Sequence, residues 1–213
     1  SLLSPYLNLG LLHAEEVVSA ALKRFKKGDI PLAGAEGFIR QIIGWREYIN
    51  GLYWFFGDLY RAENGLAAKR SLLPLFEDSS KTKMNCVSTN VRDIEARAWV
   101  HHIPRLMVLS NLALITGTSP QEFLDWMRRA FIDAADWVMV PNVYGMCLFA
   151  DGGTFATKPY IGGSNYIKKM SNYGNGPWNE VWDGLFWRFL DKQRETFRKN
   201  PRWAMLISAW DKM

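Results

Sequence analysis

Helical periodicity is the feature of this sequence that most restricts its fold. Spacing of three and four residues between apolar positions puts them on one face of an α-helix. No segment alternates β-branched and polar residues over a length that would form a sheet. The sequence therefore predicts an all-α fold, with one domain over residues 1–213. The segments with helical spacing are 11–27, 35–56, 91–116, 120–135 and 182–199.

Proline and glycine divide the predicted helices. Pro104 lies inside residues 91–116 and should kink or interrupt that helix near residues 100–103. Gly44 and Gly51 occur inside a predicted helix, and this placement indicates close contacts with neighbouring helices. Residues 57–84 are polar and rich in turn formers, so we expect a loop that carries short helical pieces.

Composition excludes several protein classes. The longest nearly apolar run, residues 106–115, is too short to span a bilayer, and no signal peptide is visible. We therefore expect a cytoplasmic protein without a membrane partner. Two cysteines exclude a disulfide framework and a four-cysteine metal site. The excess of 26 basic over 21 acidic residues favours a phosphate-bearing partner.

The high aromatic content has more than one explanation at this point. The chain holds 10 Trp, 8 Tyr and 12 Phe. They can form an aromatic core with tryptophans at its rim, a binding site for planar rings, or a redox relay. The sequence contains no glycine-rich nucleotide loop and no HExxH pattern.

One helical segment carries unusual polar residues. His101 and His102 are adjacent, so on a helix they point about 100° apart and cannot chelate one ion from one face. They are either satisfied core residues or part of a functional pocket. Arg105 follows in the same apolar segment and needs an acidic partner if it is buried. Asp125, Asp133 and Asp136 are the candidates.

The chain carries a series of distinctive motifs along nearly its whole length. They are LSPYLNLG at 3–10, FIRQIIGWREY at 38–48, NC at 85–86, HHI and RLM within 101–107, FADGG at 149–153, KPYI at 158–161, NYI and KMS within 165–171, and RKNPR at 198–202. Together these motifs resemble the photolyase and cryptochrome family, in particular its bacterial iron–sulfur cryptochromes and prokaryotic (6-4) photolyases. The resemblance implies a helical flavin-binding domain standing alone, without the family's antenna domain and without an antenna chromophore in this chain.

The resemblance implies FAD as cofactor. Arg105 and Asp133 match the ion pair that flanks the flavin ring in the family. The chain departs from the family pattern at Ala135, where related proteins often carry an acid, and at Met139, where a polar side chain usually faces the flavin. The remaining matched positions are Ser1, Leu2, Leu3 and Ser4 for the pyrophosphate, and Arg46 and Trp99 for the cavity wall.

The resemblance also implies residues for repair and photoreduction. His101 and His102 match the histidines that protonate the lesion in (6-4) repair. Tyr160 matches a residue beside the lesion, and Trp45 a residue that stacks on the flipped-out base. Trp126 matches the tryptophan nearest the flavin in the photoreduction relay. The residue after it is Met127, which cannot carry a radical in the same way, and Trp137 is a possible substitute.

The expected DNA partner is single-stranded or UV-damaged. Its phosphates are expected to contact Arg128, Arg129, Lys158, Lys168 and Lys169. The family's four-iron cluster needs four cysteines, and only Cys86 matches a ligand position, so we expect no cluster.

Two functions remain open from the sequence. The first is light-driven repair of UV pyrimidine lesions, preferentially (6-4) photoproducts, and the second is a flavin photoreceptor or DNA-binding module without efficient repair. The sequence does not predict an oligomeric state.

Overall fold

The computed structural model describes residues 2–200, 203, 207, 208, 210 and 211. Over these residues the regular structure is helical, and the only strand-like pairing is an isolated parallel bridge between Arg70 and Thr118. The predicted all-α fold is confirmed. The α-helices are α1 Ser4–Asn8, α2 Ala14–Lys26, α3 Leu32–Arg40, α4 Arg46–Phe56, α5 Asn85–Arg97, α6 Asn111–Thr116, α7 Pro120–Ala130, α8 Asp136–Pro141, α9 Ser164–Lys169, α10 Pro177–Lys192 and α11 Arg194–Arg198.

Short helical segments of other types connect these helices. The π-helical segments are η1 Gln41–Trp45, η5 Pro104–Ser110 and η6 Asn142–Cys147. The 3-10 segments are η2 Gly57–Ala62, η3 Pro74–Phe76 and η4 Ser79–Lys81, and all of them lie in the region predicted to be a loop with helical pieces.

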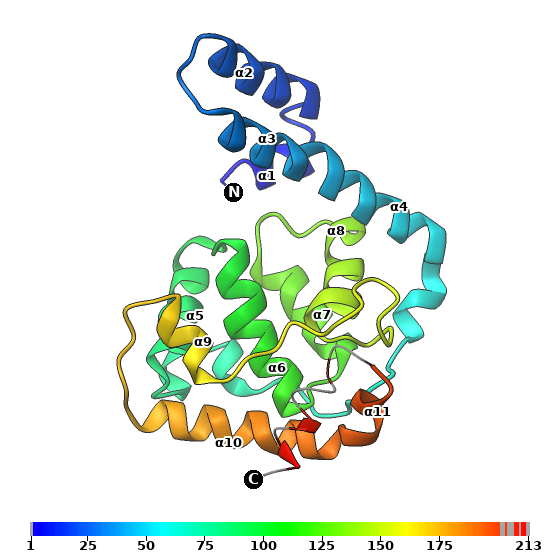
Figure 1. The fold of residues 1–213 in the computed structure, drawn as a ribbon, viewed down its shortest axis with the longest axis vertical. Helices are drawn as coiled ribbons and strands as arrows, with labels where there is room; N and C mark the ends of the chain where they lie inside the picture. The colour runs from blue at the N-terminus through cyan, green and yellow to red at the C-terminus, as the bar shows by residue number, and fades with distance from the viewer. Residues whose placement is uncertain (1, 201–202, 204–206, 209, 212–213) are drawn as a thin grey trace.

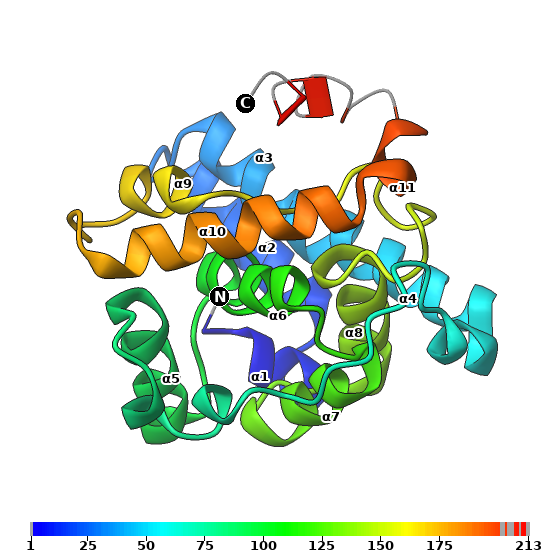
Figure 2. The same cartoon turned by 90° about the horizontal axis from the view of Figure 1, so that it is seen from below.

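The helices form a main body and an N-terminal layer on one end of it. In Figure 1, α1, α2 and α3 lie at the top, α4 descends along one side, and α10 runs along the bottom of the body. A large core cluster fills the body, and a small second cluster around Leu7, Val17 and Ile42 holds the N-terminal layer together. Figure 2 shows α6 and α10 side by side on the face opposite α1–α3.

The break predicted at Pro104 is present, and it begins earlier than expected. Helix α5 ends at Arg97, and Ala98 caps it in the left-handed conformation with φ of 51°. The chain resumes helical structure only at His102, and Pro104 occupies the first turn of η5. The pyrrolidine ring is tolerated there because the first-turn N–H groups have no helical partner.

The prediction about Gly44 and Gly51 is wrong. No atom lies within 4 Å of the position that a Cβ would occupy at either residue. The glycine that permits close packing is Gly145 in η6, where a Cβ would lie 2.3 Å from the Cβ of Phe155 and 2.8 Å from the hydroxyl of Tyr60. Sequence alone did not distinguish this position from the others.

Aromatic side chains fix α10 to the body. Trp182 is fully buried, and its indole N–H donates to the Gly162 carbonyl at 3.0 Å. Trp187 lies nearer the surface and stacks on Trp210. The helix ends where Gln193 turns inward and donates to the Leu66 carbonyl at 2.9 Å. No helix in the described part of the chain is long and apolar enough to cross a membrane.

Candidate functional site

Two adjoining cavities lie between the N-terminal layer and the body. The smaller has a volume of about 180 Å³ and the larger about 560 Å³. We call them together the cleft. The larger volume falls in the range of roughly 300–1,000 Å³ found for small-molecule sites. The two cavities share the side chains of Ser4, Trp45, His102, Leu106 and Met146.

The three π-helical segments of the described chain all line this cleft. Trp45 comes from η1, Arg105 and Leu106 from η5, and Asn142 with Met146 from η6. A π turn inserts a residue into an α-helix and redirects the side chains that follow it, and such turns are frequent at functional sites. The local backbone therefore presents side chains from three separate stretches of sequence to one cavity.

A buried ion pair forms part of the wall of the smaller cavity. Arg105 donates from Nη1 to Oδ1 of Asp133 at 2.8 Å and from Nη2 to Oδ2 at 3.1 Å. The exposed fractions of the two side chains are 13% and 7%. A two-point contact of this kind fixes both charged groups in orientation as well as in distance. Arg105 also donates from Nε to the Val100 carbonyl at 2.7 Å and lies 4.0 Å above the ring of Phe131.

The same aspartate ties the N-terminal layer to the body. Ser4 Oγ donates to Oδ2 of Asp133 at 2.6 Å, and Asn8 Nδ2 donates to its backbone carbonyl at 2.8 Å. Arg46 in turn donates to Oδ1 of Asn8 at 2.8 Å and lies 4.8 Å above the ring of Trp137. These contacts place Ser4, Arg46, Arg105 and Asp133 in one polar network along the cleft.

The histidine pair lines the cleft just before η5 begins. Both residues are partly accessible to solvent, and both line the smaller cavity. The backbone N–H of Ile103 donates to Nδ1 of His101 at 3.2 Å, so the proton of a neutral His101 ring resides on Nε2. Protein atoms around the cavity desolvate His102, and together with the positive charge of Arg105 they lower its pKa.

Aromatic residues surround the larger cavity. Trp45 is 38% exposed and packs against Tyr48 and, edge to face, against Phe155. Tyr160 lines the same cavity, and the ammonium of Lys158 lies 6.0 Å from the centre of its ring. The structure thus brings Trp45, Tyr160 and His102 to one opening, with a lysine beside it.

Trp126 does not line the cleft. It is buried, donates from its indole N–H to the Phe76 carbonyl at 3.0 Å, and packs edge to face on Phe131. Phe131 separates it from Arg105, whereas the neighbouring Met127 lines the smaller cavity. The predicted relay position is therefore one ring away from the cavity wall.

Sequence reasoning did not identify Asn142. It lines the smaller cavity one turn beyond Met139, and Met139 also lines it and is buried. The spacing of three residues along one helix face is the signal that could have found Asn142, because both side chains then face the same side. Ala135 lies at the start of α8 and does not line either cavity.

The cleft fits a cofactor that accepts hydrogen bonds. The indole nitrogen of Trp99, which lines the smaller cavity, is buried and has no hydrogen-bond partner within the described protein. An unpaired buried donor costs about 1–3 kcal/mol, and an acceptor on a bound group would remove that cost. The buried guanidinium–carboxylate pair of Arg105 and Asp133 provides both a donor and an acceptor group beside it. Ser1 lies outside the described residues, and Leu2 and Leu3 adjoin Ser4 at the start of α1.

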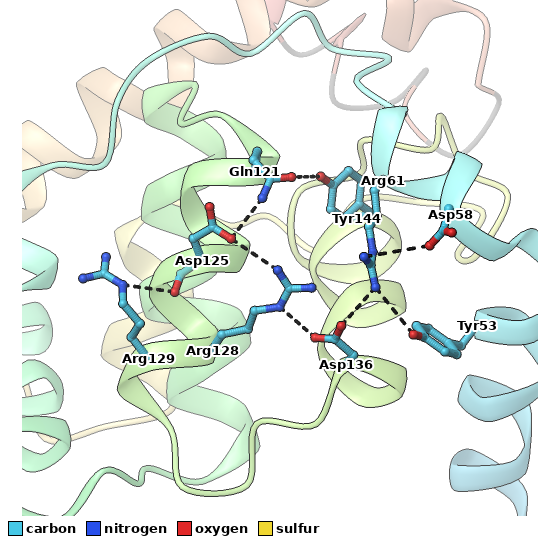
Figure 3. Close-up of polar contacts among 9 residues, drawn as sticks. All are labelled: Tyr53, Asp58, Arg61, Gln121, Asp125, Arg128, Arg129, Asp136 and Tyr144. Atoms are coloured by element: carbon cyan, nitrogen blue, oxygen red, sulfur yellow. Dashed lines mark hydrogen bonds and ion pairs between the residues drawn. The ribbon is translucent and has the colours of Figure 1, made fainter.

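The predicted phosphate contacts are not brought together. Figure 3 shows Arg128 between Asp125 and Asp136, at 3.3 and 2.7 Å, in a network that also includes Arg61. Arg129 pairs with Glu77 at 2.9 Å. Neither arginine lines the cleft, and carboxylates neutralise both of them. The contacts of Arg128 and Arg61 connect α7, α8 and η2, and the contact of Arg129 connects α7 to the residue after η3. Both α7 arginines therefore have a structural role in holding these elements together.

The two predicted lysines of α9 also lie away from the cavity wall. Lys168 donates to Asn175 at 3.0 Å, and Lys169 sits in the last turn of α9. Neither lines the cleft. Of the predicted basic contacts, Lys158 is therefore the one that adjoins the opening.

The cysteines are buried and separate from any ligand cluster. Burial raises the pKa of the Cys86 and Cys147 thiols to about 11. Within the described residues no three His, Cys, Asp or Glu side chains are grouped so that they could hold a metal ion. The absence of an iron–sulfur cluster stays a prediction that iron analysis can test.

Comparison with known proteins establishes the relationship of the chain. It is 43% identical to a (6-4) photolyase of Agrobacterium fabrum, over an alignment of 223 positions that covers the whole chain and 44% of that protein. The chain belongs to the photolyase and cryptochrome family. It spans less than half the length of that photolyase. No protein-family model matches it.

A second relative of this photolyase-family chain is an uncharacterized protein of Acanthamoeba polyphaga mimivirus. The identity is 42% over 107 residues, which cover 50% of the chain and 85% of the viral protein. Membership of the photolyase family makes the cleft the candidate functional site. The positions matched to the family's ion pair, histidines and stacking tryptophan all line its walls.

Proposed function

We propose that this chain binds FAD in the cleft and repairs UV-damaged DNA in the light, with a preference for (6-4) photoproducts. The observation that carries the proposal is the convergence of Arg105 and Asp133, the two histidines and Trp45 on one pair of adjoining cavities. The relationship to a (6-4) photolyase supports the same activity. FAD, when bound and reduced, would supply the light-excited electron for repair.

The buried pair would orient the cofactor. Arg105 and Asp133 are held by two hydrogen bonds to each other and by the Val100 carbonyl and Ser4 hydroxyl, so neither group has to reorganise on binding. A preorganised pair of fixed charges is more effective in a water-poor cavity than in solution. Trp99 would donate its free indole N–H to the same bound group.

The histidine pair would donate the proton that the lesion needs. His101 holds Nδ1 against a backbone N–H and so presents Nε2–H as the donor atom. The lowered pKa of His102 keeps this second ring neutral near pH 7, when it can accept a hydrogen bond. One ring is thereby a fixed donor and the other a neutral partner, which suits proton delivery to a bound base.

The opening of the cleft would hold the extruded base. Trp45 presents a partly exposed ring, and stacking of a base on an aromatic ring contributes about 1–3 kcal/mol. Tyr160 faces the same space, and Lys158 beside it would contact a phosphate. DNA is thus the proposed partner, bound over the larger cavity.

Illumination of the flavin-loaded protein with a (6-4)-containing oligonucleotide tests the proposal. We expect repair in the light and none in the dark. His101→Ala and His102→Ala should keep flavin and DNA binding and lose repair, whereas His13→Ala, at the remote start of α2, should repair at the parental rate. Parental repair by both cleft variants would refute the role of the pair.

The alternative function is a flavin photoreceptor or DNA-binding module without efficient repair. The specific observation in its favour is Met139, an apolar side chain in the cavity wall at the position where the family usually carries a polar one. Bound flavin and lesion binding without light-dependent repair would favour this alternative. Failure to bind flavin at all would refute both repair and the photoreceptor function, and lesion binding without flavin would favour the DNA-binding module.

A further inference from the structure

We propose that a second cavity, on the face opposite the cleft, binds a small organic diphosphate. The cavity has a volume of about 290 Å³ and lies between residues 66–70, the end of α6 and helix α10. It shares no lining residue with the cleft. Figure 2 shows α6 and α10 on this face, and Figure 1 shows it at the end of the body away from α1–α3.

The charge on the cavity wall points to an anion of more than one charge. Among the residues that the structure describes, four basic side chains line it and no aspartate or glutamate does. None of the four takes part in an ion pair or a side-chain hydrogen bond with any other residue that the structure describes. They are Lys69, Arg70, Arg188 and Lys192.

The absence of partners is unusual for arginine in this protein. Most arginines of the described chain are held by a carboxylate, an amide or an aromatic ring. Among those residues only Arg70, Arg92 and Arg188 have side chains without any such contact. Two of these three line the same cavity.

The basic side chains on the cavity wall repel one another when no anion is bound. Arg188 and Lys192 stand four residues apart on α10, and like charges at this spacing destabilise a helix by about 0.2–0.5 kcal/mol. Lys69 and Arg70 bring two more positive charges to the opposite wall. Their convergence without an acidic residue among the lining therefore indicates a ligand that supplies the negative charge.

The wall that carries Lys69 and Arg70 is rigid. Asn64 clamps the segment by accepting from the Ala68 N–H at 2.9 Å and donating to the Ala68 carbonyl at 2.8 Å. The backbone N–H of Arg70 donates to the Gly117 carbonyl at 3.0 Å, and the Arg70 carbonyl accepts from the Ser119 N–H at 2.8 Å. A site held in place in this way loses little conformational entropy when a ligand binds.

The backbone of the same wall stores strain. Ala67 lines the cavity with φ of 49°, in the left-handed region that a residue with a Cβ seldom adopts. Such strain persists only where the surroundings fix the conformation, and it is concentrated at ligand sites. Gln193 provides part of that support through its hydrogen bond to the Leu66 carbonyl.

The floor of the cavity selects an organic ligand over a free anion. Leu114, Leu148, Leu185 and Phe189 contribute apolar side chains beneath the basic rim. A diphosphate would balance the rim, and an apolar or aromatic body would cover the floor. The volume of this cavity is at the small end of the range of about 300–1,000 Å³ for ligand pockets. The apolar part of the ligand is therefore no larger than one nucleoside or a short hydrocarbon.

Calorimetric titration of the FAD-saturated chain tests the proposal. The probes are ADP, with an aromatic body, dimethylallyl diphosphate, with an aliphatic body, and inorganic pyrophosphate, with none. We expect one of the two organic probes to bind at least about tenfold more tightly than pyrophosphate. The tighter of the two identifies the chemistry of the body. Equal affinity for all three, or no binding, would overturn the proposal.

Matched variants locate the site. Arg70→Gln combined with Arg188→Gln should weaken binding of the organic probe by about tenfold or more, whereas Arg92→Gln, which removes an unpartnered arginine of α5 outside the cavity, should not. Because FAD is saturating, binding that survives in these titrations is not binding in the cleft. Equal weakening in Arg92→Gln, or full displacement of the probe by undamaged single-stranded DNA, would refute a small-molecule site and indicate a general polyanion surface.

Discussion

Replacement of Trp182 by alanine tests whether aromatic packing holds the C-terminal region to the body. The side chain is fully buried between α10 and the core. An aromatic side chain buries about 150–250 Å², which at about 25 cal/mol per Å² corresponds to roughly 4–6 kcal/mol. Measured Trp→Ala substitutions in cores fall at about 3–5 kcal/mol.

Loss of the Trp182 hydrogen bond adds little to this figure. The Gly162 carbonyl that accepts from the indole also accepts from Nδ2 of Asn111 at 2.9 Å, so it keeps a partner in the variant. The cost of an unsatisfied buried carbonyl therefore does not arise. We expect Trp182→Ala to lower the free energy of unfolding by about 3–5 kcal/mol.

Guanidinium chloride unfolding followed by far-UV circular dichroism measures the effect. Trp54→Ala is the matched control, because the Trp54 side chain is 72% exposed and its loss should change the free energy of unfolding by less than about 0.5 kcal/mol. A Trp182→Ala variant as stable as Trp54→Ala would refute the reasoning. So would a large loss of stability on Cys86→Ala together with loss of bound iron, because a cluster would then hold this region.

Four further outcomes are expected. Gly145→Ala should destabilise the protein by about 1–3 kcal/mol through overpacking, while Gly51→Ala, with open space at its Cβ, should stabilise it by about 0.4–1 kcal/mol; thermal unfolding measures both. The free energy of unfolding should fall as the pH is lowered from 6.5, the ordinary pKa of histidine, to the lower pKa that His102 has in the folded state, because the unfolded chain binds more protons over this range. The variant His102→Gln should lose less stability over the same range, as measured by denaturant titrations at several pH values. The slope of log affinity for DNA against log salt should become shallower by about 0.7–0.9 in Lys158→Gln and by less in Arg129→Gln, which is paired with Glu77. Elemental analysis should find no iron, because the chain has two cysteines and a four-iron cluster needs four ligands.

Periodicity predicted the helices well because most of them bury one face against a shared core. Their ends were harder to predict. The predicted helix over residues 35–56 is three consecutive elements, since the π turn of η1 changes the face that Trp45 presents. Residues 182–199 are likewise two helices, and the break at Gln193 depends on a hydrogen bond to Leu66, which is 127 residues away in the chain. The residues around Gln193 alone therefore do not predict that the helix breaks there.

The site shows the same division between what local sequence specifies and what tertiary contacts decide. Three acids were candidates for the partner of Arg105, and sequence alone left them open. In the folded chain Asp125 and Asp136 bind Arg128, whereas Asp133 pairs with Arg105 in the wall of the smaller cavity.

Arg128 illustrates why charge type alone does not identify a phosphate contact. Its positive charge fitted a DNA contact, but an arginine held between two carboxylates offers an approaching phosphate little uncompensated charge. Arg70 and Arg188 have no carboxylate partner among the described residues and are 118 positions apart in sequence. They line one cavity because Gln193 and Thr118 hold the segment around residue 70 against α10 and α6. The proposed diphosphate site therefore depends on where the fold places such cations as well as on their lack of a carboxylate, and both properties exist only after folding.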